Sequence, residues 1–228
     1  MGRLKLDKHN VLIIGDTHIP YQQEGYLEHC LSVQRDERCG TVVHIGDLVD
    51  NLSLSRQQRH NPDAQSPNDE IELTIKQLKP WFKAFPKVKF TYGTHDKRLS
   101  NRATEANVPS IGIKSFRETW QLPRGWVDNL EFVIDDVLYK HGTSTGMNAH
   151  RELAIYNRMS AVQGHSHAFA GIAYVANQRE CLFGMNVGTG IDNSKLAFAY
   201  GISFKVKPIV SCGVVYNGED PRLFRMRL

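Results

Sequence analysis

Apolar runs rich in β-branched residues alternate with segments of helical spacing along the first half of the chain. Three of the runs end at a glycine and are typical of strands buried on both faces. They are residues 10–18 (NVLIIGDTH), 41–47 (TVVHIGD) and 88–92 (VKFTY). Apolar residues recur at helical spacing over 24–38 and 69–85, where Pro80 is expected to kink or end the helix.

The segments that follow the second and third strands are more polar. Residues 48–60 are expected to begin a short helix, and residues 61–69, rich in Pro, Asn and Asp, to form a loop. Residues 98–110 and 111–122 are expected to be helices that flank the core.

The second half of the chain consists mainly of short strand-like pieces separated by turn residues. These pieces are residues 130–136, 137–142, 161–167, 169–176, 180–188, 201–217 and 221–228. One helix is expected among them, over residues 147–159. The pattern predicts a mixed α/β (α+β) fold in which two sheets pack face to face with helices outside. We expect a single domain, residues 1–228, because no linker, repeat or low-complexity segment interrupts the chain.

Composition limits the class of protein. The chain of 228 residues is 41% hydrophobic and 23% charged, with no apolar run near the ~20 residues that a membrane span needs. Its first ten residues lack an apolar secretory segment, so we expect no secretory leader. Its four cysteines show no CxxC spacing, which favours a cytoplasmic protein without a zinc knuckle or disulfide framework. The net charge of +4 is compatible with an anionic substrate but does not indicate nucleic acid, and no oligomeric state is predicted.

Five strands are followed at once by side chains that bind metal ions. Each strand is an apolar run with an adjacent glycine. The polar groups are Asp16-Thr17-His18, Asp47-Leu48-Val49-Asp50, Thr94-His95-Asp96, His141 and His165-Ser166-His167. One such group alone is commonly a surface turn, but together the five contain half of the ten histidines. The other histidines are interpreted as structural or surface residues: His9, His29, His44, His60 and His150.

The residue types and their spacing indicate a metal centre. Alternate residues of an extended chain point the same way, so D-x-H and H-x-H would each offer two ligands to one side. Carboxylate and imidazole together suit Mn²⁺, Fe, Zn²⁺, Co²⁺ or Ni²⁺ better than Ca²⁺. The strong ligands are Asp16, His18, Asp47, His141, His165 and His167. They exceed the three or four protein ligands that are usual for one catalytic ion, and they suit two ions that share a carboxylate.

The order of these groups resembles the calcineurin-like metallophosphoesterase superfamily. The superfamily pattern of D-x-H, G-D-x-x-D, G-N-H-D/E, H and G-H-x-H is similar to GDTH, GDLVD, GTHD, HG and GHSH, which span residues 15–167. The resemblance implies a four-layer αββα double β-sandwich with a dinuclear metal site at the sheet edge. The chain has no separate capping domain, as in compact bacterial and phage-type members.

The resemblance also implies roles for the motif residues. One ion would be held by Asp16, His18, Asp47 and His167. The second would be held by the bridging Asp47 with His141, His165 and Thr94. His95 would face the substrate phosphate and assist the leaving group, with Asp96 as the residue that orients it, and Asp50 would hydrogen-bond to the ligands.

Three basic residues follow the third motif, Lys97, Arg98 and Arg102. They could add cationic contacts to the substrate, but for any one of them a solvated charge at the start of a helix is the favoured interpretation.

This ligand set implies a phosphatase or phosphodiesterase with two divalent ions, Mn²⁺ being favoured. Ions about 4 Å apart lower the pKa of a shared water and align its in-line attack on phosphorus. The substrate would be a phosphate ester, with mono- and diesters left open. Thr94 stands where the superfamily has asparagine, and its single hydroxyl is a weaker ligand, so we expect weaker binding of the second ion. The chain is either a natural variant with a loosely held ion or carries a substitution that impairs the site.

Two other functions stay open. The first is a binding scaffold, that is, a phosphoesterase fold with a weakened site. Thr94 supports this interpretation, whereas the six retained ligands argue against it. A nuclease fits the basic charge, but no platform of aromatic and basic residues for stacking bases is found. Asn51 follows Asp50 where protein Ser/Thr phosphatases of the superfamily have arginine, which disfavours a phosphoprotein substrate. Residues 56–69 and 142–150 are expected to shape access to the site.

Overall fold

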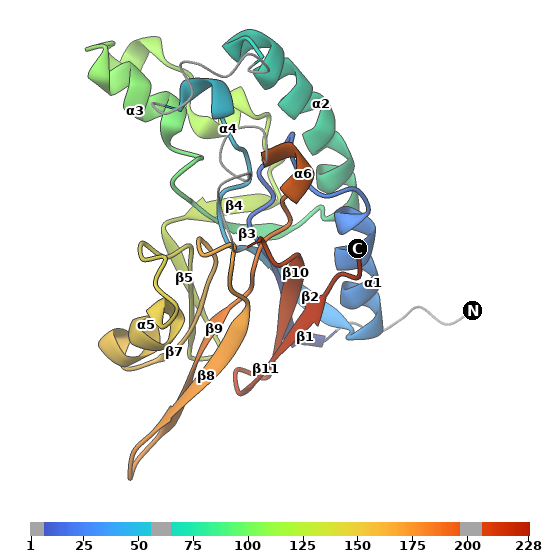
Figure 1. Ribbon diagram of the computed structural model, residues 1–228, viewed down its shortest axis with the longest axis vertical. Coiled ribbons are helices and arrows are strands. Elements are labelled where there is room, and N and C mark those ends of the chain that lie inside the picture. Colours follow the sequence, from blue (N-terminus) through green and yellow to red (C-terminus); the bar gives the residue numbers. More distant parts are fainter. Residues whose placement is uncertain (1–6, 56–64, 197–206) are drawn as a thin grey trace.

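Two β-sheets pack face to face between helices in the computed structural model, which describes residues 7–55, 65–196 and 207–228 (Figure 1). The first sheet has the strand order β11-β10-β1-β2-β3-β4. Its strands are β1 (Asp7–Ile14), β2 (Cys39–His44), β3 (Val88–Thr91), β4 (Trp126–Asn129), β10 (Ser211–Tyr216) and β11 (Asp220–Arg225). Strands β1 to β4 are parallel, and the β10–β11 hairpin adds to β1 in the antiparallel direction.

The second sheet has the order β5-β6-β7-β9-β8. Its strands are β5 (Glu131–Ile134), β6 (Val137–Lys140), β7 (Ser160–Gln163), β8 (Gly171–Ala176) and β9 (Cys181–Asn186). Strands β6, β7 and β9 are parallel, so the chain leaves β6 and β7 at the same edge of this sheet.

Helices cover the outer faces of both sheets. They are α1 (Tyr26–Asp36), α2 (Pro67–Ala84), α3 (Arg98–Glu105), α4 (Phe116–Thr119), α5 (Ala149–Asn157) and α6 (Asn193–Leu196), with 3₁₀ turns η1 (Leu52–Leu54) and η3 (Ser110–Gly112). Figure 1 shows α1 and α2 on one side of the paired sheets and α5 on the other. No helix in the described ranges combines the length and the apolar character that crossing a membrane requires.

Alternation along β1 explains the layers. Val11 and Ile13 lie in the apolar cluster between the sheets, whereas Leu12 and Ile14 lie in the cluster that includes buried residues of α1 and α2. Both faces of the second half of β1, residues 11–14, are therefore buried, which is why this part of its sequence is a continuous apolar run. On the far side, Ala154 of α5 packs against the second sheet. The predicted four-layer αββα architecture is confirmed.

Several local predictions are wrong in their bounds. Of the two alternatives given for Pro80, an end of the helix is wrong, because α2 continues through Pro80 and ends only at Ala84. The helix expected over 98–110 ends at Glu105, because Asn107 adopts a left-handed conformation and Pro109 cannot continue the hydrogen-bond pattern.

Two further helices are shorter than expected. The helix predicted over 111–122 is reduced to α4, which begins at a capping box between Ser115 and Glu118. In the described part of 48–60, residues 48–55, the predicted short helix is the 3₁₀ turn η1. Residues 56–64, with His60 and part of the expected loop, and residues 201–206, the start of the strand predicted over 201–217, lie outside the described residues.

Candidate metal centre

The loops that follow β1, β2, β6 and β7 bring the six predicted ligands together. Their ligand atoms fall into two groups, within each of which all atoms lie within 4.8 Å of one another. The first group is Asp16, His18, Asp47 and His167, and the second is Asp47, His141 and His165. Asp47 is common to both groups, so the arrangement has the form of two neighbouring cation sites with one shared carboxylate.

The shared carboxylate lies between histidines of both sheets. Asp47 Oδ2 is 3.3 Å from His141 Nε2 and 3.8 Å from His18 Nε2. Its other oxygen, Oδ1, accepts a hydrogen bond of 2.7 Å from the backbone N–H of His95. Thr94 is also beside it, with Oγ1 3.5 Å from Asp47 Oδ2. The loop after β3 thus fixes the orientation of this carboxylate.

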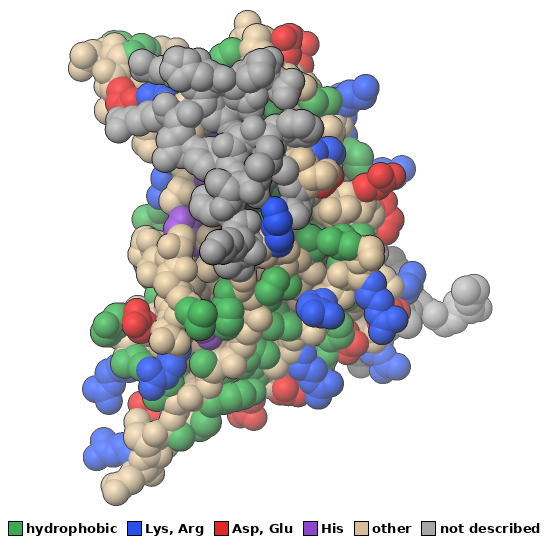
Figure 2. Space-filling view, in the orientation of Figure 1, with side chains coloured by type: hydrophobic (Ala, Val, Ile, Leu, Met, Phe, Trp, Pro, Cys, Tyr) green, Lys and Arg blue, Asp and Glu red, His purple; other side chains and the backbone are tan. Residues whose placement is uncertain are grey.

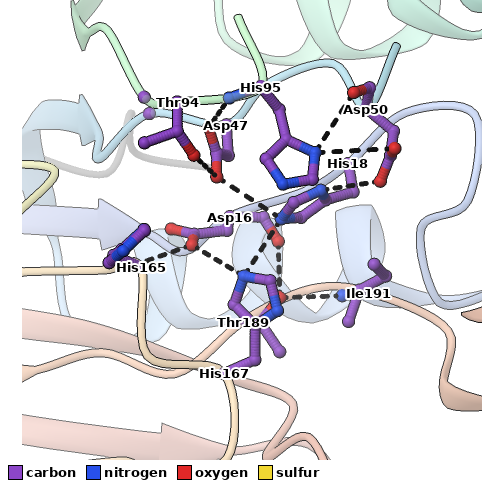
Figure 3. A network of polar contacts seen from close by, with 12 residues as sticks. Asp16, His18, Asp47, Asp50, Thr94, His95, His165, His167, Thr189 and Ile191 are labelled. Atoms are coloured by element: carbon purple, nitrogen blue, oxygen red, sulfur yellow. Dashed lines mark hydrogen bonds and ion pairs between the residues drawn. The ribbon is translucent and has the colours of Figure 1, made fainter. Parts of the chain in front are cut away.

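The chemistry of the donor set fits divalent ions. Figure 3 shows the side chains of Asp16, His18, Asp47 and His167 pointing toward one another. Imidazole nitrogens of His18 and His167 face each other at 3.1 Å, as do those of His141 and His165. Asp16 Oδ1 is buried without a hydrogen-bond partner among the described residues. Convergent imidazole lone pairs and an unpartnered buried carboxylate oxygen are the features of a cation site.

Buried carboxylates make the site electrically negative. Burial opposes a charged ring at His141, but Asp47 and Asp16 outweigh it and raise the pKa of His141 to about 10. Such a shift means that the site attracts positive charge.

Glycines at the strand ends let the ligand carboxylates approach the backbone. A Cβ at Gly93 would overlap the carboxylate of Asp47, and a Cβ at Gly164 would overlap that of Asp16. Gly46, with φ of 99°, instead provides a sharp turn immediately before Asp47. Close approach and the sharp turn are therefore provided by different glycines.

The expectation that extended chain presents the ligands is wrong. His18, Asp47 and His165 have φ of 49°, 47° and 67°, which is the left-handed region rather than a strand conformation. Such conformations cost energy in residues other than glycine and persist where surrounding contacts impose them. One such contact is the hydrogen bond of 2.9 Å from His18 N to Asp47 O. The two loops therefore hold each other in the conformation that directs the ligands inward.

Asp50 connects His18 to His95. Its buried carboxylate accepts a hydrogen bond of 2.9 Å from His18 Nδ1, and its Oδ1 lies 3.5 Å from His95 Nδ1. His95 Nδ1 is also 3.1 Å from the Asp50 carbonyl oxygen. Burial opposes ionisation of Asp50, but its contacts with His95 and the His18 hydrogen bond hold its pKa below the usual range.

Asp96 has a different position from the one predicted. Its carboxylate accepts hydrogen bonds from the backbone N–H groups of Asp47 (2.8 Å), Val49 (3.2 Å) and Gly93 (2.8 Å). It therefore ties the loop after β2 to the loop after β3, and the contact that orients His95 comes from Asp50. The prediction that Asp96 orients His95 is corrected accordingly.

His44 contacts the loops that carry the ligands, although the sequence indicated only a structural or surface histidine. It is buried, its Nε2 is 3.0 Å from Thr17 Oγ1, and its Nδ1 accepts a bond of 3.3 Å from Gly46 N. Thr17 in turn donates to Leu48 O at 2.9 Å. Because a lone histidine at the end of a buried strand gives no signal of its partners, the sequence did not distinguish His44 from other core histidines.

A four-layer αββα fold with two groups of His/Asp donors at the sheet edge defines an α/β protein with a candidate metal centre. The family model for calcineurin-like phosphoesterases matches residues 9–187. The chain belongs to this family.

Individual relatives are distant. The Gene 54 protein of Mycobacterium phage L5 is 27% identical over 213 residues, which cover 82% of this chain and 81% of that protein. The phosphoesterase Yfce of E. coli is 14% identical with a TM-score of 0.40, covering 91% of this chain and 88% of that one. Vps29 of Chaetomium thermophilum is 11% identical with a TM-score of 0.44, covering 95% and 96% of the two chains.

Proposed function

We propose that this chain is a metal-dependent phosphoesterase that hydrolyses a phosphomonoester or phosphodiester. The observation that supports the proposal is the pair of donor groups that share Asp47. Asp16, His18, Asp47 and His167 would hold one divalent ion. His141, His165 and Thr94 would hold the second together with Asp47. Bound there, two ions, with Mn²⁺ favoured, would supply Lewis acidity toward the phosphoryl oxygens and a water of lowered pKa.

The substrate would approach the site from the side of His95 and His167. These side chains keep 21% and 24% of their surface exposed, whereas Asp16 and His18 have none. Asp50 holds the His95 ring at this open side. From there, His95 would contact a phosphate ester and assist departure of the leaving group.

The surface gives no added support to nucleic acid as the substrate. On the part of the face in Figure 2 that is not drawn in grey, Lys and Arg side chains are dispersed among acidic ones rather than gathered into one patch. A nuclease would be expected to carry a clustered basic surface.

The cytoplasmic location and the single domain that the sequence indicates remain predictions.

The second candidate is a binding scaffold built on the same fold. It is favoured by Thr94, whose side chain is exposed and whose hydroxyl is at the limit of hydrogen-bond distance from Asp47. A scaffold would need neither ion, whereas the enzyme needs metal for turnover.

Metal analysis and ester hydrolysis together test the proposal. The metal-free protein is loaded with Mn²⁺, its metal content is measured, and chromogenic phosphate mono- and diesters are offered. We expect metal to bind and at least one ester to be hydrolysed. His95→Ala is expected to keep the metal and lose turnover, because His95 lies outside both donor groups that share Asp47. Absence of bound metal would refute the enzyme, and bound metal without hydrolysis of either ester would favour the scaffold.

A further inference from the structure

Arg98, in the first turn of α3, contacts both residues that define the open side of the site. Its Nη1 donates to the carbonyl oxygen of Asp50 at 2.9 Å and to Asp50 Oδ1 at 3.1 Å. Its Nη2 lies 3.0 Å from His95 Nε2. One guanidinium therefore links the Asp50 main chain, the Asp50 carboxylate and the far nitrogen of the His95 ring.

The identity of these partners determines which ring nitrogen of His95 carries the proton. Arginine is only a donor, so in the uncharged ring His95 Nε2 accepts the hydrogen bond from Arg98 and carries no proton. A backbone carbonyl is only an acceptor, so the His95 Nδ1–H must donate to the Asp50 oxygen at 3.1 Å. Both ends of the ring are thus specified by groups that cannot exchange roles.

We propose that Arg98 is a positioning residue that holds His95 in the Nδ1–H tautomer, with the Nε2 lone pair kept as an acceptor at the open side of the site. Its importance for turnover rests on the proposed phosphoesterase function. The forked shape of the guanidinium is what the role requires, because Nη1 must reach Asp50 while Nη2 reaches His95. A residue that merely attracted phosphate would need charge but not this fork.

A neighbouring anion would compete for the same guanidinium. The Arg98 side chain is 24% exposed, so its outer edge can meet a phosphoryl oxygen while Nη1 stays bound to buried Asp50. Loss of the Nη2 contact would then free His95 Nε2 beside the substrate. Arg98 thus determines whether His95 Nε2 is hydrogen-bonded or free when the ester binds.

The tautomer can be measured directly in the metal-free protein. Two-dimensional ¹H–¹⁵N spectra of the imidazole groups at alkaline pH distinguish a protonated ring nitrogen from an unprotonated one, and His95→Gln identifies the His95 signals by their loss. We expect an unprotonated Nε2 in the unaltered protein and a mixture of tautomers in Arg98→Ala. A protonated Nε2 in the unaltered protein, or an unchanged pattern in Arg98→Ala, would overturn the inference.

Arg117→Ala is the matched control for this spectrum. Arg117 also joins a carboxylate, Asp128, to backbone carbonyls, those of Pro123 and Trp126, but it does not contact His95. Its removal should leave the His95 pattern unchanged. A similar change in both variants would mean that the spectrum reports general loosening, and the inference would fail.

Kinetics of the Mn²⁺-loaded protein separate positioning from charge. Arg98→Ala is expected to lower kcat by about 10- to 100-fold, as for other residues that orient groups around a metal site, with little change in KM. Arg98→Lys keeps the charge but not the fork, so kcat should stay low. A higher KM in Arg98→Ala that Lys restores would show that Arg98 binds substrate by charge instead. If no ester is hydrolysed but the spectra behave as expected, the tautomer inference stands and the proposed function fails.

Discussion

Position 94 lies beside the carboxylate that the two donor groups share. Thr94 Oγ1 is 3.5 Å from Asp47 Oδ2, too far for a strong hydrogen bond. We predict that Thr94→Asn binds the second Mn²⁺ ion at least about tenfold more tightly, because a longer side chain with an amide oxygen, a ligand type that suits Mn²⁺, reaches further into the site. Titration of the metal-free protein with Mn²⁺, monitored by calorimetry, measures both binding steps.

Thr94→Val is the control for this titration, because valine keeps the shape of threonine without its hydroxyl. It should bind the second ion no more tightly than the unaltered protein. Equal affinity in Thr94→Asn and the unaltered protein would show that position 94 contributes nothing to the second ion.

Individual residues were predictable to the extent that their chemistry is rare. A carboxylate or imidazole directly after a buried strand can be recognised in the sequence, and the structure brings all six predicted ligands into the two donor groups that share Asp47. The partner of His95 was assigned wrongly, because Asp96 is its neighbour in sequence while Asp50 is its neighbour in space. Sequence adjacency could not show that Asp96 is directed toward backbone amides.

Among the helices and strands, the positions of the buried apolar strands β1, β2 and β3 were predicted from the sequence, whereas several short elements were not. Strand β4 was not predicted at all, because only four residues separate Gly125 from Leu130 and Val127 is exposed on it. Helices α3 and α4 end two residues before left-handed residues, Asn107 and Gln121, whose conformation depends on local turns rather than on apolar spacing.

The glycines at the strand ends test whether close approach of the backbone is needed for metal binding. We predict that Gly93→Ala lowers metal affinity by at least about tenfold, because a Cβ there would displace the Asp47 carboxylate. Gly146→Ala is the matched control, since a Cβ at Gly146 meets only Ser144 Oγ at 3.6 Å. Metal titration of both variants measures the effect. Similar affinities in the two variants would mean that the close approach at Gly93 is not needed.

The end of β2 adds a pH dependence through His44. Burial lowers the pKa of His44 to about 3, while its unfolded value is about 6.5. The unfolded chain therefore binds more protons between these values, so the stability associated with neutral His44 is complete above pH ~6.5 and falls as the pH decreases toward ~3. The slope from this one group is about 1.4 kcal/mol per pH unit.

We predict that His44→Gln reduces this acid sensitivity, because the glutamine amide can still donate to Thr17 but does not titrate. Urea unfolding of the metal-free proteins at pH ~6.5 and ~5 should show a loss of free energy of unfolding about 2 kcal/mol smaller in the variant. Carboxylates titrate in both proteins and cancel in the comparison. The same acid dependence in both would contradict a neutral buried His44.

At the scale of the whole molecule, the candidate metal centre lies where the two sheets meet. Asp16 and Asp47 follow strands of the first sheet, whereas His141 and His165 follow strands of the second. The pairing of sheets was predictable from the strand pattern, but the strand order was not. The placement of the β10–β11 hairpin beside β1 depends on contacts between distant parts of the chain, which leave no periodic signal in the sequence.

Ligands from both sheets mean that bound ions should stabilise the packing of the whole fold. An ion that binds the folded but not the unfolded chain adds about 2.7 kcal/mol at a free concentration of 100 times its Kd. For a protein of this size we predict that removing metal with a chelator lowers Tm by about 5–10 °C. Thermal unfolding with and without Mn²⁺ measures the shift.

Asp47→Asn, which weakens the ligand common to both groups, should lose most of this dependence of Tm on Mn²⁺, whereas Gly146→Ala should keep it. If Tm of the unaltered protein is the same with and without Mn²⁺, the ligands do not hold ions across the sheets.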